Sequence, residues 1–176
     1  MSDKPRPRKL GHLVLKVRDL EESCRFYTDI VGLEVSDRIA DRMVFLRSGS
    51  DHHDLALAQL PPDALETQPA NSPGLEHFSY LVDSYEEIER VVGLLRKHEV
   101  TIVRGPGKHG PGENCFLVFK DPDGNNVEFY CEMRQIDAEH PYEPKTWDDT
   151  IDSLDQWHFK RWAVEPPPFL KKKYGL

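Results

Sequence analysis

The sequence has few of the features that mark several common protein classes. Its three cysteines, Cys24, Cys115 and Cys131, are odd in number and show no CxxC spacing, which argues against a disulfide framework or a cysteine-rich zinc motif. No apolar run approaches the roughly 20 residues of a membrane span. The polar stretch from Met1 to Pro5 lacks the apolar core of a signal peptide. We therefore expect a cytoplasmic protein without a membrane partner, whose reduced cysteines pack as small hydrophobes.

Positive charge is also scarce. The chain has 23 Lys and Arg against 31 Asp and Glu, a net charge of −8, and no basic face of the size that nucleic acid requires. Its basic run, Lys171–Lys173, is interpreted as a solvated tail. With 38% hydrophobic and 10% aromatic residues among 176, the chain can still bury a core. The composition therefore indicates one domain, or two small modules that share one core, and no nucleic-acid partner.

An internal repeat with an offset of 65 residues runs through the chain. At that offset residues 11–17 align with residues 76–82, and His12 falls on His77. Each copy predicts a strand, then a helix, then a group of short strands, so the repeat indicates a duplicated fold. Each copy also carries one imidazole, and Glu128 lies in the last strand of the second copy. This combination indicates a metal site where the two copies join.

The first copy is expected to form a module of about residues 9–60. Hydrophobic periodicity predicts a strand, a helix that ends at Gly32, and three short strands. These elements are expected at Lys9–Val17, Asp19–Val31, Glu34–Ala40, Met43–Arg47 and Asp54–Gln59. A linker that contains several prolines, residues 60–74, then leads to the second copy.

The second copy is expected to form a module of about residues 74–132. Its first strand starts at Leu75, a capping-box pattern at Ser84 opens its helix, and a glycine-rich loop, residues 105–112, interrupts its strands. The remaining strands are expected at Thr101–Arg104, Cys115–Lys120 and Asn126–Cys131. Residues 1–132 would then be one domain of paired modules.

An aromatic-rich extension, residues 133–176, follows the paired modules. It contains three tryptophans within 16 residues, and one short helix is expected around Trp147–Phe159. Side chains of this kind do not stay exposed to water. The extension is expected to cover the open side of the sheet, to close the core of the same domain, or to pack on a partner subunit in a homo-oligomer.

Strand parity separates the candidate ligands from the core. Successive side chains of a strand point to opposite faces, so His12, His77 and Glu128 each lie on the less apolar face of their strand. Two histidines and one carboxylate with open coordination positions form the ligand set of non-haem Fe(II) oxygen chemistry. A divalent ion would also offset the cost of burying a lone carboxylate. A salt bridge from Glu128 to an arginine is the alternative, and an isolated strand histidine is more often structural.

Five stretches, in the same order along residues 9–132, resemble a known family. They are Gly11–Leu15, Asp51–Leu57, Leu75–Phe78, Gly105–Gly112 and Lys120–Tyr130. The chain resembles the vicinal oxygen chelate superfamily, and within it the type I extradiol ring-cleavage dioxygenases of the catechol 2,3-dioxygenase kind. The resemblance implies an α+β fold in which two βαβββ modules form a cupped mixed sheet around a metal site. This is the glyoxalase/bleomycin resistance/dioxygenase fold, here in a one-domain form.

The resemblance also implies roles for five residues. His12, His77 and Glu128 would hold Fe(II), with Mn(II) as a possible substitute. His53 would be the catalytic acid and base, and His109 would hydrogen-bond the substrate or the oxygen-derived ligand. Without the resemblance, His53 would be interpreted as an idle, exposed histidine beside its neighbour in sequence, and His109 as a solvated loop residue.

One position departs from the family pattern. Members usually carry a tyrosine ten residues before the ligand glutamate, and this chain has Val118 there. Tyr130 shares the face of Glu128 and is the other candidate contact to substrate. The expected function is cleavage of a vicinal aromatic diol with O2. A glyoxalase-like isomerase would need a second carboxylate where the first copy has Ala56, whereas a metal-dependent thiol transferase and a small-molecule binding protein remain open.

Overall fold

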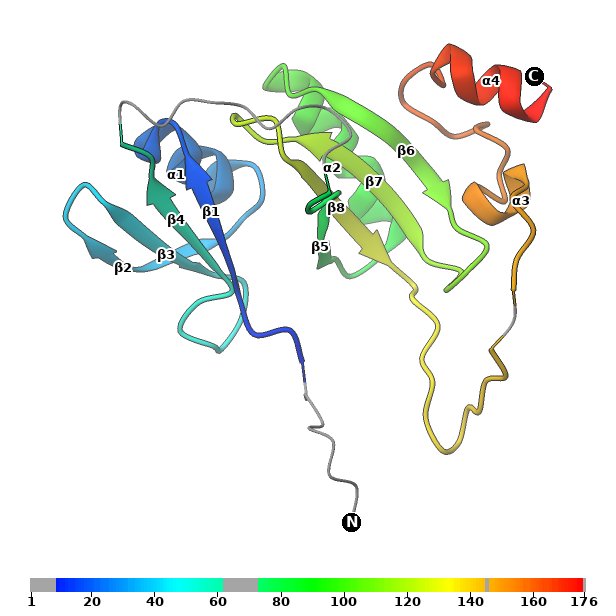
Figure 1. Ribbon diagram of the computed structural model, residues 1–176, viewed down its shortest axis with the longest axis horizontal. Coiled ribbons are helices and arrows are strands. Elements are labelled where there is room, and N and C mark those ends of the chain that lie inside the picture. The colour runs from blue at the N-terminus through cyan, green and yellow to red at the C-terminus, as the bar shows by residue number, and fades with distance from the viewer. Residues whose placement is uncertain (1–8, 62–72, 145, 176) are drawn as a thin grey trace. The chain divides into compact units, whose positions relative to one another are not determined.

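The computed structural model describes residues 9–61, 73–144 and 146–175 (Figure 1). The chain divides into two compact units, Met1–Ser72 and Pro73–Leu176. Most of the expected proline-containing linker, residues 62–72, lies outside the described residues, as does the start of the chain. In the described part, no helix combines the length and the apolar character that crossing a membrane requires.

The first unit is one βαβββ module. Its strands are β1 (Leu13–Val17), β2 (Glu34–Ile39), β3 (Met43–Arg47) and β4 (Leu55–Gln59), in the order β1-β4-β3-β2, and α1 spans Leu20–Asp29. Strands β1 and β4 are parallel, and the other pairs are antiparallel. The helix starts where the Asp19 side chain accepts a hydrogen bond from the backbone of Glu22, a standard N-terminal cap. Its apolar stripe joins Leu15 and Val17 in the core.

The second unit repeats the same module. Its strands are β5 (Phe78–Leu81), β6 (Ile102–Lys108), β7 (Cys115–Lys120) and β8 (Asn126–Cys131), in the order β5-β8-β7-β6, and α2 spans Tyr85–Lys97. Ser84 caps α2, as its capping-box pattern predicts. The helix buries Ile88, Val91 and Leu95 and lies across one face of the sheet (Figure 1). The predicted duplication and the α+β fold class are confirmed.

The register of the two sheets confirms the repeat residue by residue. In the first unit Val14 pairs with Ala56 across β1 and β4, and in the second unit Ser79 pairs with Glu128 across β5 and β8. Val14 and Ser79 are 65 residues apart, which is the offset of the repeat. Ala56 is therefore the structural equivalent of Glu128, as the sequence predicts, and the first module has no carboxylate at this place.

Several of the expected boundaries are wrong. The first strand of the second copy begins at Phe78 and not at Leu75, and α1 ends at Asp29 and not at Val31. Strand β1 begins at Leu13 and not at Lys9, because its partner β4 begins only at Leu55 and the first backbone bond runs from Leu13 N to Asp54 O. As a result His12 and His77 both lie one residue before their strands. Strand β6 continues to Lys108, four residues into the expected glycine-rich loop. A Cβ on Gly107 would overlap the Phe116 ring, so glycine lets the two strands approach closely there.

The extension belongs to the second unit, and its helices differ from the single one expected. It contains α3 (Ile151–Leu154) and α4 (Pro168–Tyr174), and the helix predicted around Trp147–Phe159 is limited to its middle turn. Asp155 ends α3 because its backbone is extended and its buried carboxylate accepts hydrogen bonds from the backbone of Trp157 and Phe159. The extension then packs along β6, where Lys108 N donates to the same carboxylate.

Candidate metal centre

A buried carboxylate and two imidazoles converge in the second unit. Glu128 of β8 has only 5% of its surface exposed. Its Oε2 accepts a hydrogen bond from the Ser79 hydroxyl and lies 3.0 Å from Nε2 of His77. Its Oε1 lies 3.9 Å from Nε2 of His109. Two of the three expected metal ligands are thus neighbours, and the expected substrate-contacting histidine lies just beyond them.

The orientation of His77 is set by a second carboxylate. Nδ1 of His77 bonds to the Glu76 carboxylate, which is held in turn by the Arg104 guanidinium at 3.2 and 3.3 Å and by the Asn126 amide. Burial raises the pKa of Glu76, but hydrogen bonds from His77 and Arg104 outweigh it, and the net pKa is lowered. Glu76 is therefore ionised at neutral pH and keeps the His77 proton on Nδ1. A carboxylate behind a histidine is a common outer partner of protein metal ligands.

The contact between His77 and Glu128 fits a divalent ion. With the proton of a neutral imidazole on Nδ1, both facing atoms, Nε2 of His77 and Oε2 of Glu128, carry lone pairs, and either a proton or a cation must lie between them. Two donors at right angles, each about 2.1 Å from one ion, are separated by about 3.0 Å. The observed separation is 3.0 Å. Nε2 of His77 and Oε2 of Glu128 are therefore spaced like two adjacent ligands of one metal ion.

His109 follows β6, and the extension determines which of its nitrogens faces Glu128. Its ring stacks on Phe116 with centroids 4.0 Å apart, and Nδ1 lies 2.8 Å from the carbonyl oxygen of Leu154. A carbonyl only accepts, so Nδ1 carries the proton and Nε2 presents a lone pair toward Glu128. Burial lowers the pKa of His109, which favours this neutral form. His109 is thus a fixed hydrogen-bond acceptor and not a solvated loop residue.

The first unit brings together the two other predicted histidines. The rings of His12 and His53 are 4.7 Å apart, and Phe45 of β3 packs edge-on against His53. Nδ1 of His53 lies 3.0 Å from Nδ1 of His52, whose Nε2 lies 2.8 Å from the Asp37 carboxylate. If His52 donates from Nε2 to Asp37 as a neutral ring, its Nδ1 accepts a hydrogen bond from the Nδ1–H of His53. Nε2 of His53 then carries the free lone pair, which is the form a general base needs.

The two predicted substrate contacts lie beside Glu128. Val118 of β7 is the direct cross-strand neighbour of Glu128 and is fully buried. Directly opposed side chains share one face of a sheet, so Val118 makes the immediate surroundings of the carboxylate apolar. Tyr130 lies two residues further along β8, is half-buried, and pairs with Phe116.

Several residues of the site were missed by sequence reasoning. The supporting side chains are Asp37, His52, Glu76, Ser79 and Asp155, and the Leu154 carbonyl joins them. Glu76 is adjacent to the predicted ligand His77, so local sequence held a signal for it. Ser79 is 49 residues from Glu128 and reaches it only because β5 pairs with β8. Leu154 is 45 residues from His109, and no periodicity could have paired them.

Comparison with known proteins places the chain in a family. The family model described as the Glyoxalase/Bleomycin resistance protein/Dioxygenase superfamily matches residues 9–129. The chain therefore belongs to this superfamily, as the resemblance predicted. Among solved structures, an integron cassette protein from the metagenome of the Halifax Harbour sewage outfall has 28% identity and a TM-score of 0.57. The match covers 71% of this chain and 99% of that one.

The curated relatives include ring-cleavage enzymes by name. Metapyrocatechase 2 of Cupriavidus necator is 31% identical over 153 residues, 86% of this chain and 44% of that protein. The manganese-dependent 2,3-dihydroxybiphenyl 1,2-dioxygenase of Geobacillus genomosp. 3 is 28% identical over 147 residues, 81% and 45% of the two chains. The iron-dependent extradiol dioxygenase of Rhodococcus jostii is 26% identical over 144 residues, 74% and 45%. The chain spans less than half the length of these relatives.

Proposed function

We propose that this chain is an extradiol dioxygenase that uses Fe(II) and O2 to open the ring of a vicinal aromatic diol. The observation that carries the proposal is the contact of Glu128 with Nε2 of His77, with the Glu76 carboxylate behind the imidazole. The names of the three curated relatives support the same chemistry. Ala56 at the position equivalent to Glu128 argues against a glyoxalase-like ligand set with a carboxylate from each module.

The proposed ligands are His12, His77 and Glu128. His12 and His77 occupy equivalent places one residue before the first strand of their modules, so duplication supports a shared role for both. These three residues would hold Fe(II), and the ion would supply the redox chemistry that lets a diol react with O2. The iron-dependent and manganese-dependent relatives are consistent with Fe(II) here and with Mn(II) as a substitute.

The remaining residues would handle protons and exclude water. Nε2 of His53 would take a proton from a diol hydroxyl, because the His52 and Asp37 pair holds the other proton on Nδ1. Nε2 of His109 would accept a hydrogen bond from a substrate hydroxyl, because Leu154 holds its Nδ1 proton. Val118 and the Phe116 ring would form a dry wall beside the substrate ring, where electrostatic contacts are stronger than in water.

Ring opening can be tested directly. The chain is purified without oxygen, loaded with one equivalent of Fe(II), and mixed with diols of graded size while O2 uptake and product mass are followed. We expect the uptake of one O2 molecule per diol and a product that contains both atoms of that O2 molecule. Glu128→Gln is the matched control, and it should bind iron weakly and leave every diol intact. Iron-loaded parent protein that consumes no O2 with any diol would overturn the proposal.

A further inference from the structure

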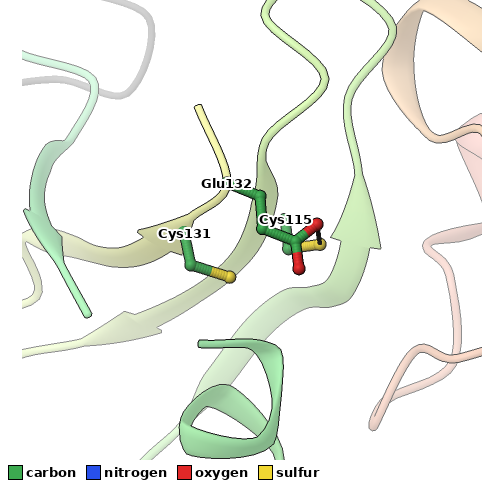
Figure 2. A group of neighbouring side chains, drawn as sticks. All are labelled: Cys115, Cys131 and Glu132. Carbon is green, nitrogen blue, oxygen red and sulfur yellow. Dashed lines mark hydrogen bonds between the residues drawn. The ribbon is translucent and has the colours of Figure 1, made fainter. Parts of the chain in front are cut away.

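Two thiols and a carboxylate lie together at the open end of the β7–β8 hairpin. Cys115 begins β7, Cys131 ends β8, and the two residues are directly opposed in the register. Their sulfur atoms and a carboxylate oxygen of Glu132 all lie within 4.8 Å of one another (Figure 2). Both cysteines have 1% of their surface exposed, whereas the Glu132 side chain is 53% exposed. The two thiol groups are thus buried together beside the solvent-accessible carboxylate of Glu132.

This group is separate from the candidate iron centre. Cys131 shares its face of β8 with Val127 and Phe129, and Glu128 points to the opposite face because strand side chains alternate. Regular alternation would also send Glu132 away from the thiols. Glu132 instead adopts a positive φ of 59°, which breaks the alternation, and its Oε2 accepts a hydrogen bond from the Cys115 thiol at 3.7 Å.

The spacing and the charge suit a thiophilic divalent ion. In a tetrahedral zinc site with Zn–S of about 2.3 Å and Zn–O of about 2.1 Å, neighbouring sulfur and oxygen atoms are about 3.6 Å apart. The observed separation of Cys115 Sγ and Glu132 Oε2 is 3.7 Å. Two thiolates and a carboxylate would leave an excess negative charge on a divalent ion. Lys108 Nζ, 3.6 Å from Glu132 Oε2, balances it.

We propose that Cys115, Cys131 and Glu132 bind a thiophilic divalent cation such as Zn²⁺, with a water molecule as the fourth ligand. Without the ion both cysteines are neutral thiols, since burial raises the pKa of Cys115 to about 12 and also raises that of Cys131. Cation binding displaces their protons. The ion joins the ends of β7 and β8 one residue from Asn114, whose carbonyl accepts a hydrogen bond from the backbone of His109.

Co²⁺ is a suitable probe because thiolate ligation gives charge-transfer absorption that histidine and carboxylate ligation do not. The reduced, chelator-treated full chain is titrated with Co²⁺ in the Glu128→Gln background, which weakens the candidate iron centre. We expect about one equivalent to develop thiolate absorption, and Zn²⁺ to displace it. Cys24→Ser removes the third buried thiol and should leave the signal unchanged, whereas Cys115→Ser and Cys131→Ser should abolish it.

Glu132→Gln keeps the test decisive if a buried serine disturbs folding. The side chain is exposed, so this variant should fold normally, bind Co²⁺ at least tenfold more weakly, and lose the rise in Tm that Zn²⁺ gives the parent. Absence of thiolate absorption in the parent would overturn the proposal. Absorption that survives in Cys131→Ser, or that disappears in Cys24→Ser, would also overturn it. None of these readouts depends on diol cleavage.

Discussion

Replacing Gly110 by alanine tests how tightly the extension controls His109. Gly110 lies next to His109, and its amide donates to the carbonyl of Ser153 in α3. A Cβ added to Gly110 would lie 2.5 Å from the Asp152 carbonyl oxygen, 2.8 Å from the Trp147 ring and 3.0 Å from Cα of Ser153. Two of these atoms are backbone, so α3 itself must move. The Leu154 carbonyl, one residue further along, moves with it.

The size of the effect follows from these contacts. Overpacking of a closed site costs about 1–3 kcal/mol, which for a chain of 176 residues corresponds to a Tm lower by about 2–12 °C. The His109 bond to Leu154, 2.8 Å long in the parent, would lengthen or break. Loss of one buried hydrogen bond costs about 1–3 kcal/mol, so the proton of His109 would no longer be held on Nδ1. We expect turnover to fall by about tenfold or more while Fe(II) is still bound.

The assay combines turnover, iron content and ¹⁵N NMR of the histidine rings, which distinguishes Nδ1-protonated from Nε2-protonated imidazole. Gly93→Ala is the matched control. Gly93 is an exposed residue of α2 with nothing within 4 Å of its added Cβ. That change should leave turnover intact and stabilise the helix by about 0.5–1 kcal/mol. If Gly110→Ala retains the parent Tm, turnover and His109 tautomer, the extension does not position this histidine.

Three further predictions concern the proposed centre. Glu76→Gln should weaken Fe(II) binding by about 10–100-fold in a metal titration, the usual effect of losing an outer partner of a ligand, and unchanged affinity would remove Glu76 from the site. His53→Phe should retain iron but lose roughly 10²-fold in turnover, so iron loss in this variant would instead make His53 a ligand. Val118→Tyr should improve turnover of small catechols and reduce that of bulky diols, at a cost of about 1–3 kcal/mol in stability because the site is fully buried. Val118→Phe adds similar bulk without a hydroxyl, and equal substrate profiles for the two variants would rule out a role for the hydroxyl.

Local patterns predicted most of the fold. The helical stripe from Leu20 to Tyr27 and the Ser84 cap each depend on neighbours in sequence, and the structure reproduces both. The extent of β6 was not predictable in this way. Its glycines look like a loop in sequence and serve close packing against Phe116, which is a tertiary contact.

The candidate site shows the same division. His12 and His77 were predicted from the repeat and Glu128 from its place in the last strand, and the structure places His77 beside Glu128. The residues that orient the imidazoles were not found, since His109 depends on Leu154 in the extension and His53 on a chain of contacts through His52 to Asp37. Such contacts depend on how the elements fold back on one another, and hydrophobic periodicity carries no information about them.

The paired positions Val14–Ala56 and Ser79–Glu128 bear on how new activities arise on a duplicated scaffold. The strand neighbour of Ala56 is Val14, which has no hydroxyl to receive an acid placed at position 56. Glu128 has that hydroxyl from Ser79. A carboxylate gained in the first module alone would therefore lack the hydrogen bond that Ser79 gives Glu128, and one gained together with a serine at position 14 would have it. A change from a ligand set with one carboxylate to a set with a carboxylate from each module therefore requires two substitutions together. The strand register identifies their positions as 14 and 56.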